Sequence, residues 1–261
     1  MNQLAVALLL SASVLIAQPR NAGSITTHST QVLPLVILGE GWTERLLLQN
    51  VDDSISAIGT ISFYTRDGQP WPIALRDRGT ASTFLVALTP GQTAVFETLV
   101  SFASQQLGWA IISLGGQGSG DLLGQVVFRK QADGRPDLMT SMILGDRAFS
   151  RTTTFFDNTG GNYTGMGILT SELCTLSSCQ NGDALRVTIR DLAGTIIGQK
   201  QITQKRGTLY WMNLGVDFPE TNGKTGTFAV EPVSSFSVYL TSFSLQFAGN
   251  GAFTAITPFE D

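Results

Sequence analysis

The fold is decided by a pattern that the chain carries twice, as Thr60-Ile61-Ser62-Phe63-Tyr64-Thr65-Arg66-Asp67-Gly68 and again as Leu185-Arg186-Val187-Thr188-Ile189-Arg190-Asp191, closed by Gly194. In both stretches apolar residues alternate with polar residues, so each stretch has one apolar face and one polar face. This alternation is typical of strands in an antiparallel sheet with one solvated side. The sequence therefore predicts an all-β fold.

Two further pairs of stretches match in the same order. Residues 108–112 resemble 226–230, and residues 123–128 resemble 240–245. Preserved order and nearly preserved spacing are typical of a duplicated unit, and 261 residues are enough for two domains. We therefore predict two tandem antiparallel β-sandwich modules, with boundaries at 32–146 and 147–261.

Each module is expected to contain about seven short strands separated by turn signals. An immunoglobulin-like sandwich is the first interpretation and a jelly roll the second. The Cys…Trp…Cys core of antibody domains is absent, so "immunoglobulin-like" describes architecture only. Two local features are also predicted. One is a single helical turn at 99–106. The other is a β-bulge near 241–242, because the apolar residues are even-numbered before this point and odd-numbered after it. The predicted strands are 32–38, 45–49, 60–65, 83–88, 92–97, 109–113, 124–129 and 139–143, followed by 152–156, 164–169, 185–190, 195–201, 208–212, 227–231, 236–247 and 252–256.

The N-terminus has the features of a secretory signal peptide. An apolar run from Leu4 to Ala17 ends at a small residue, which predicts a signal peptide over 1–17. The run is shorter than the roughly 20 residues that a spanning helix needs. Residues 18–31 are small and polar and are expected to form a flexible leader. The chain is therefore expected outside the cytoplasm, in the periplasm, at the cell surface or in the medium.

The only two cysteines are Cys174 and Cys179. In a secreted chain an even number of cysteines at short spacing indicates a disulfide. A zinc site would need more ligands, and the only histidine, His28, lies far away in the leader.

Composition excludes several classes of function. Charged residues make up 14% of the chain, against about 25% in typical proteins. The 16 Lys and Arg residues are scattered, so no basic stripe for nucleic acid is present. Membrane contact is expected only through the signal peptide, and no cofactor motif occurs.

No catalytic constellation is evident. His28 lies outside both modules, which argues against a Ser-His-Asp arrangement. Hydrolysis by paired carboxylates requires two acidic side chains across a cleft, and surface positions are the simpler interpretation of the acidic residues. The acidic candidates are Glu40, Glu44, Glu97, Asp137, Glu172, Glu220 and Glu231.

One loop, Asp157–Asn162, is rich in oxygen ligands. Its carboxylate, amide and carbonyl oxygens suit calcium, but a glycine-containing turn stabilised by Asp157 and Asn158 is the favoured interpretation. We therefore assign no metal site.

Recognition by aromatic rings is a further hypothesis, because exposed rings offer flat contacts to proteins and glycans. Trp71 lies between Pro70 and Pro72 and is the first candidate for an exposed ring; Tyr210 and Trp211 are the second. Core packing is nevertheless the favoured interpretation for all three.

Three strings, residues 41–50, 124–129 and 156–161, resemble strand motifs of uncharacterised secreted bacterial proteins with tandem immunoglobulin-like β-sandwich modules. The resemblance extends from about residue 32 to the C-terminus and implies an extracytoplasmic bacterial setting. It implies no activity and no site residues.

These observations predict a secreted or cell-surface, non-catalytic binding or structural protein. Its loops and edge strands are expected to contact a protein or a glycan, and its edge strands are expected to permit self-assembly by strand addition. The alternative is an extracellular hydrolase that acts on polysaccharide through a carboxylate pair.

Overall fold

The computed structural model describes residues 30–99, 102–115, 120–131, 134, 136–144, 151–170, 182–233, 240–256 and 259–260. The predicted signal peptide, most of the leader, the module boundary at 146/147, and both Cys174 and Cys179 lie outside these residues. Within the described ranges, no helix is long and apolar enough to cross a membrane.

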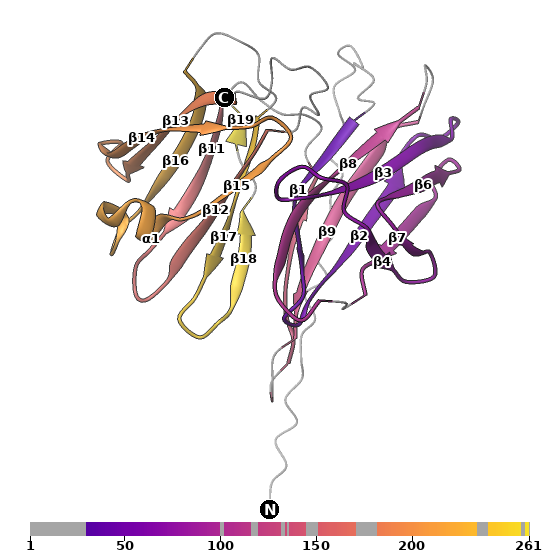
Figure 1. The fold of residues 1–261 in the computed structure, drawn as a ribbon, viewed down its shortest axis with the longest axis horizontal. Helices are drawn as coiled ribbons and strands as arrows, with labels where there is room; N and C mark the ends of the chain where they lie inside the picture. The colour runs from indigo at the N-terminus through magenta and orange to yellow at the C-terminus, as the bar shows by residue number, and fades with distance from the viewer. Residues whose placement is uncertain are drawn as a thin grey trace, which may run out of the picture.

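The first unit consists of strands arranged mainly in two stacked antiparallel sheets (Figure 1). We call them the β1 sheet, with strand order β1-β8-β3-β6, and the β2 sheet, with order β10-β9-β2-β7. A hairpin of β4 and β5 lies beside them. The bounds are β1 (Thr30–Leu38), β2 (Trp42–Asn50), β3 (Ala57–Thr65), β4 (Ile73–Leu75), β5 (Gly79–Ala81), β6 (Thr83–Leu88), β7 (Thr93–Glu97), β8 (Gln106–Leu114), β9 (Leu122–Lys130) and β10 (Leu138–Ile143).

The second unit also stacks two antiparallel sheets, which we call the β13 sheet (β14-β13-β16-β11-β19) and the β12 sheet (β15-β12-β17-β18). A short helix and a 3-10 turn follow β15. The bounds are β11 (Thr152–Asp157), β12 (Tyr163–Thr170), β13 (Asp183–Asp191), β14 (Ile196–Gln204), β15 (Leu209–Asn213), α1 (Leu214–Asp217), η2 (Pro219–Thr221), β16 (Thr225–Pro232), β17 (Leu240–Phe247), β18 (Phe253–Ile256) and β19 (Phe259–Glu260).

The predicted all-β fold with antiparallel sheets is confirmed, and the two units share one strand order. If β4, β5 and β19 are left out, the strands of the two units can be matched one to one in chain order, β1 with β11 and so on to β10 with β18. Each strand of the first unit then has the same neighbours in its sheet as the matching strand of the second unit. The stretches matched in the sequence occupy equivalent strands, namely β3 with β13, β8 with β16, and β9 with β17. The repeated alternation therefore corresponds to repeated positions in the sheets.

Three local predictions are wrong, namely the helical turn at 99–106, the end of the leader at residue 31 and the bulge near 241–242. The expected helical turn at 99–106 is absent from its described part, because residues 103–104 form a bend and Gln106 already begins β8. Helix α1 occurs later, where the Asn213 side chain accepts a hydrogen bond from the Gly215 N–H at 3.1 Å. Strand β1 begins at Thr30, two residues inside the predicted leader.

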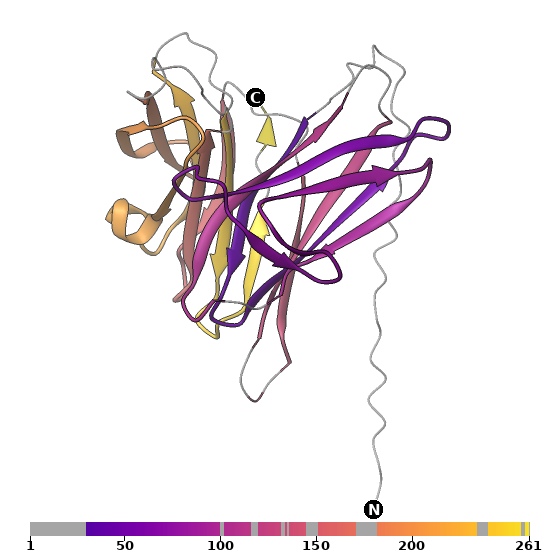
Figure 2. The same ribbon diagram turned by 45° about the vertical axis from the view of Figure 1, so that its right-hand side comes forward.

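The two units pack against each other through apolar side chains. One continuous buried cluster includes the core of the first unit and also Leu169, Phe243 and Phe253 of the second unit. The rings of Trp42 and Phe253 lie edge to face, 4.7 Å apart between centroids. In both views the last strands of the second unit, coloured yellow, lie on the side that faces the first unit (Figures 1 and 2).

This contact explains why no bulge occurs at 241–242. Strand β17 pairs with β12 without interruption from Leu240 to Phe247. Leu240 belongs to the core of the second unit, whereas Phe243 and Leu245 belong to the cluster shared with the first. Both faces of β17 are therefore buried, one against the core of the second unit and one against the first unit. Apolar residues are needed on both faces, so they occur at even and at odd positions without any shift in the backbone register.

Candidate functional site

The outward face of the β2 sheet carries a mixed pattern of apolar and charged side chains. Side chains alternate along each strand, so the odd-numbered residues of β2, β7, β9 and β10 point away from the core. The register places Arg45 between Val127 and Glu97, and places Leu47 beside Val95. Arg129 lies between Met139 and Thr43.

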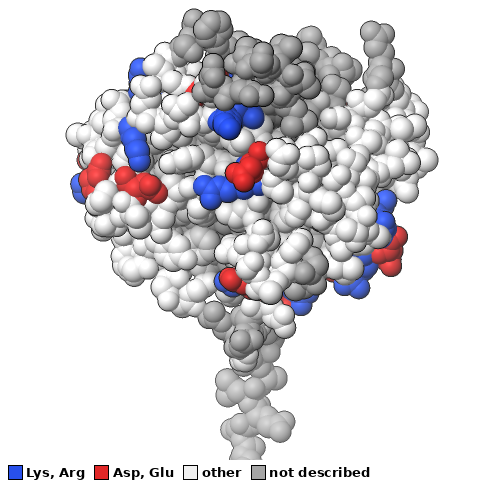
Figure 3. Space-filling model, viewed as in Figure 1, with Lys and Arg blue, Asp and Glu red and all other residues white. Residues whose placement is uncertain are grey.

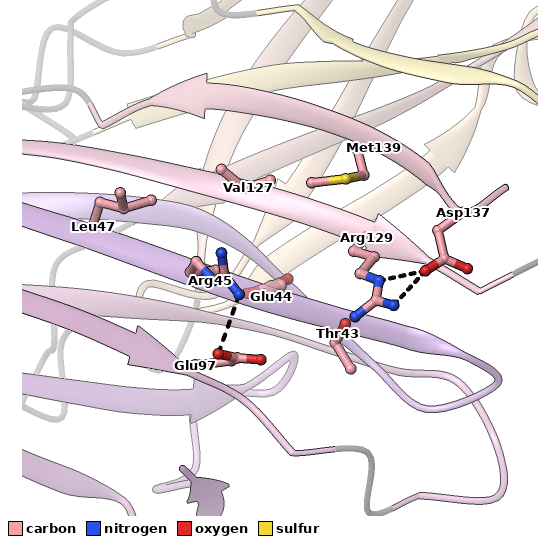
Figure 4. Close-up of a pocket in the computed structure, with 9 residues that line it drawn as sticks. All are labelled: Thr43, Glu44, Arg45, Leu47, Glu97, Val127, Arg129, Asp137 and Met139. Atoms are coloured by element: carbon pink, nitrogen blue, oxygen red, sulfur yellow. Dashed lines mark hydrogen bonds and ion pairs between the residues drawn. The ribbon is translucent and has the colours of Figure 1, made fainter. Parts of the chain in front are cut away.

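These side chains surround a hollow of about 400 Å³. The apolar side chains of Leu47, Val127 and Met139 lie beside the two ion pairs, Arg45–Glu97 and Arg129–Asp137 (Figure 4). Met139 is 60% exposed, whereas Leu47 and Val127 are half-buried. We call this surface the β2-face hollow. Its lining consists of Thr43, Glu44, Arg45, Leu47, Glu97, Val127, Arg129, Asp137 and Met139.

The charges of the hollow are paired but accessible. The Glu97 carboxylate accepts hydrogen bonds from Arg45 at 3.3 Å and from Arg76 at 3.1 Å. The Arg129 Nε–H donates to Asp137 at 2.6 Å, and both pairs are drawn in Figure 4. Each of the three arginine side chains is more than half exposed, at 53% or above. Such guanidinium groups retain donors for a carboxylate of a partner.

Glu44 contributes to the hollow from beneath. Glu44 lies on β2 between Thr43 and Arg45, but its side chain points into the core, and the residue is only 3% exposed. The carboxylate accepts a hydrogen bond from the Ile37 N–H of β1. Burial raises the pKa of the Glu44 carboxyl well above its usual value, and the Ile37 hydrogen bond opposes that rise.

The described side chains of the hollow carry guanidinium, carboxylate, hydroxyl and apolar groups, and none of these residues is a histidine, cysteine, serine or aromatic residue. Three of the acidic candidates line it, namely Glu44, Glu97 and Asp137. Glu44 is buried, and the other two already bond to guanidinium groups. Elsewhere, Glu231 pairs with the exposed Arg186 at 3.2 Å, and Glu172 lies outside the described residues.

Trp71 packs in the core, which is the favoured interpretation, and the hypothesis of an exposed recognition ring at this position is wrong. The residue is 7% exposed, and its ring packs against Phe102 with centroids 5.9 Å apart. Gly108 makes room for it: a Cβ atom at that position would lie 2.6 Å from the Trp71 ring. Tyr210 and Trp211 are half-buried, Tyr210 against the second core and Trp211 against the shared cluster. Trp71 and Trp211 thus belong to the same apolar cluster, whereas Tyr210 packs against the other one.

In the loop at Asp157–Asn162, the side-chain oxygens of Asp157 and Asn158 are engaged within the fold. The Asp157 carboxylate accepts hydrogen bonds from Thr159 Oγ1 at 2.6 Å and from the Thr159 N–H at 2.9 Å, and these bonds lower the pKa of Asp157. Asn158 bonds to Thr221 and Thr164, both at 2.8 Å. In the described part of the chain, no group of three or more His, Cys, Asp or Glu side chains could hold a metal ion.

Sequence reasoning did not identify the β2-face hollow as a site. Its two central strands, β2 and β9, coincide with the strings at 41–50 and 124–129. The available signal was that Arg45 and Arg129 share the outward face of their strands with the apolar residues Leu47 and Val127. That β2 and β9 are neighbours, and that 137–139 completes the hollow, follows only from the sheet order.

No protein-family model, no curated protein and no solved structure matches this chain.

Proposed function

We propose that this chain is a secreted or cell-surface, non-catalytic protein that binds a protein partner through the β2-face hollow. The observation that carries the proposal is the presence of one exposed methionine, Met139, and two exposed arginines, Arg45 and Arg129, in the lining of the same hollow. Methionine and arginine are both enriched in protein interfaces.

A protein partner fits this lining better than a glycan. Glycan sites present aromatic rings as flat contacts, and none of the lining residues that the structure describes is aromatic. A partner segment with an apolar side chain between acidic residues would place its carboxylates near Arg45 and Arg129. Much of the surface in Figure 3 carries no charge, and its charges occur in small groups of both signs. Nonspecific attraction is therefore weak, and local fit decides the choice of partner.

We also infer that each unit is immunoglobulin-like in its central strands. In an immunoglobulin domain strand B pairs with E, and strand C pairs with F. The first unit has the corresponding pairs β2 with β7 and β3 with β8. The outer strands differ, because β1 pairs with β8 and β9 pairs with β2. A scaffold of this type carries binding surfaces without requiring catalysis.

The proposal includes export through a signal peptide and a disulfide between Cys174 and Cys179 in a bacterial, extracytoplasmic setting. Intact mass measurement of the exported protein tests both. We expect a chain that begins after Ala17 and takes up no alkylating reagent until it is reduced.

Binding is tested with fluorescently labelled protein on intact cells of the source organism, before and after protease treatment of their surface. We expect saturable, protease-sensitive binding that Met139→Asp weakens by about tenfold or more. Val216→Asp is the matched control, because Val216 is 73% exposed on α1 of the second unit. Equal binding by both variants would show that the hollow is not the binding surface, and protease-resistant binding would point to a glycan.

A polysaccharide hydrolase is the second candidate, and one observation favours it: Glu97 and Asp137 line the same hollow. Release of reducing ends from a panel of polysaccharides, abolished in both Glu97→Gln and Asp137→Asn, would establish this function and overturn the non-catalytic one.

A further inference from the structure

We propose that two copies of this chain associate through β6, with the two strands antiparallel about a twofold axis and Leu85 opposite its counterpart. The β1 sheets of the two copies would then form one continuous sheet. Strand β6 is the edge of that sheet on the side remote from the second unit (Figure 1).

The hydrogen-bonding pattern identifies the main-chain groups that are available. Phe63 donates its N–H to the Ser82 carbonyl at 2.8 Å, and the register then runs without interruption from Ser62 opposite Thr83 to Ala57 opposite Leu88. Bonded and non-bonded pairs alternate in an antiparallel ladder. Phe84 and Val86 therefore direct their main-chain groups toward β3, whereas Thr83, Leu85 and Ala87 direct theirs outward.

Other edges of the four large sheets are covered or charged. At β1 the Ile37 N–H donates to Glu44. At β18 the Ala255 N–H donates to Thr140 of β10 at 3.0 Å, so these two edges protect each other. At β15 the Leu209 N–H donates to the Arg66 carbonyl at 2.9 Å.

The two remaining long edges are less suitable than β6. At β7 the Glu97 carbonyl accepts the Arg76 N–H at 2.8 Å, which shortens the open part of that edge. Strand β14 carries Lys200 and contacts η2. Within the described part of the chain, Thr83, Leu85 and Ala87 have no such main-chain partner.

The sequence of β6 is suited to pairing with itself. No charged residue occurs from Gly79 to Phe96, so antiparallel pairing brings no like charges together. At the equivalent edge of the second unit, Lys200 would introduce such repulsion, which is the usual protection of an edge strand. With Leu85 of one copy opposite Leu85 of the other, Thr83 of each copy lies opposite Ala87 of the other copy. Each of these opposed pairs then exchanges N–H···O=C bonds between the two copies.

Pairing would also cover apolar surface. Leu85 is 64% exposed, and Ile58, opposite Ala87 on β3, is 54% exposed. One short strand pair buries less area than a stable interface of about 1,200–2,000 Å². We therefore expect a weak, concentration-dependent dimer.

Sedimentation velocity of the full chain over a concentration series tests the association. The wild type is expected to shift from monomer to dimer as its concentration rises, and Leu85→Lys is expected to remain monomeric. Leu192→Lys is the matched control, because Leu192 is 78% exposed in the second unit, and it should behave as the wild type. A wild type that stays monomeric to about 1 mM, above the range of most weak complexes, would overturn the proposal. So would loss of the dimer in Val95→Lys on β7 with no loss in Leu85→Lys.

The register is tested by crosslinking. Opposite residues of a hydrogen-bonded antiparallel pair have Cα atoms about 5.5 Å apart, which suits a disulfide. Under mild oxidation Leu85→Cys should form a covalent dimer, and Ala87→Cys should not. The reverse result would show that the proposed register is wrong.

Discussion

At the scale of single residues, Glu44 is the unusual feature of this protein. A carboxyl group in the core of a sandwich costs free energy when it is charged. Glu44 is 3% exposed, and no cation pairs with it among the described ion pairs. Its hydrogen bond from the Ile37 N–H occupies an edge group of β1. The residue thus protects an edge strand, at a cost in stability that depends on pH.

We expect Glu44→Gln to raise the melting temperature near pH 8 and to leave it nearly unchanged near pH 4. The pKa of Glu44 is higher in the folded protein than its ordinary value of 4.5. As pH rises above that value, the unfolded chain releases this proton first, so stability falls until the folded-state pKa is passed. Glutamine keeps the shape and the acceptor but does not titrate. Each kcal/mol recovered should raise the melting temperature by roughly 2–4 °C.

Glu231→Gln is the control for this prediction, measured by calorimetry at the same pH values. Glu231 forms a surface ion pair in which both side chains are at least 36% exposed, and such pairs contribute about 0–1 kcal/mol. A lower melting temperature for Glu44→Gln at every pH would contradict the role given to burial.

Trp71 shows why exposure is difficult to predict at this scale. Two flanking prolines indicate a turn, and turns usually lie at the surface. The ring is nevertheless covered, because Gly108 of β8 leaves space for it. The two residues are far apart in the sequence, so local composition contains no sign of their contact.

At the scale of elements, the two sheets of the second unit are joined by a row of buried hydroxyl groups. Thr152 and Ser242 are fully buried, and their oxygens lie 2.6 Å apart between β11 and β17. Thr154 and Ser244 continue the row at 3.3 Å. These hydroxyls stabilise the contact only while both members of a pair are present, because an unpaired buried hydroxyl keeps its desolvation cost.

We expect Thr152→Val and Ser242→Ala each to lower the free energy of unfolding by about 1–3 kcal/mol. The double variant should lose less than the sum of the two, with a coupling of at least about 0.5 kcal/mol. Urea denaturation measures all three. Ser62→Ala is the control, because Ser62 and Thr83 form a similar but exposed pair at 3.0 Å; its effect should stay within about 0.5 kcal/mol. Strict additivity in the buried pair would contradict the coupling.

At the scale of the whole molecule, the shared apolar cluster makes the two units one structural body. Phe243 belongs to the second unit by sequence and to the core of the first by contact. A duplicated chain is usually regarded as two modules on a linker, with interfaces that permit motion. Here the buried contact is continuous with a core, so unfolding of the two units is expected to be coupled.

We therefore expect a single thermal transition that Phe243→Ala shifts as a whole, at a cost of about 3–5 kcal/mol. Differential scanning calorimetry measures this, with agreement between calorimetric and van't Hoff enthalpies as the criterion of coupling. Phe155→Ala is the matched control, because Phe155 is 42% exposed, and we expect it to cost about 1 kcal/mol or less. Two separate transitions, of which Phe243→Ala moves only one, would contradict the coupling.

The sequence by itself determined the strands, their alternation and their duplication. Ile61 and Phe63 face inward, and so do Val187 and Ile189, because side chains alternate between the two faces of any strand. This alternation is a local property of the chain. Only the tertiary structure decided which strands are neighbours, and with them the β2-face hollow, the burial of Trp71 and Glu44, and the second buried face of β17. These features depend on contacts between residues far apart in the sequence, and alternation along one strand carries no information about what its second face will meet.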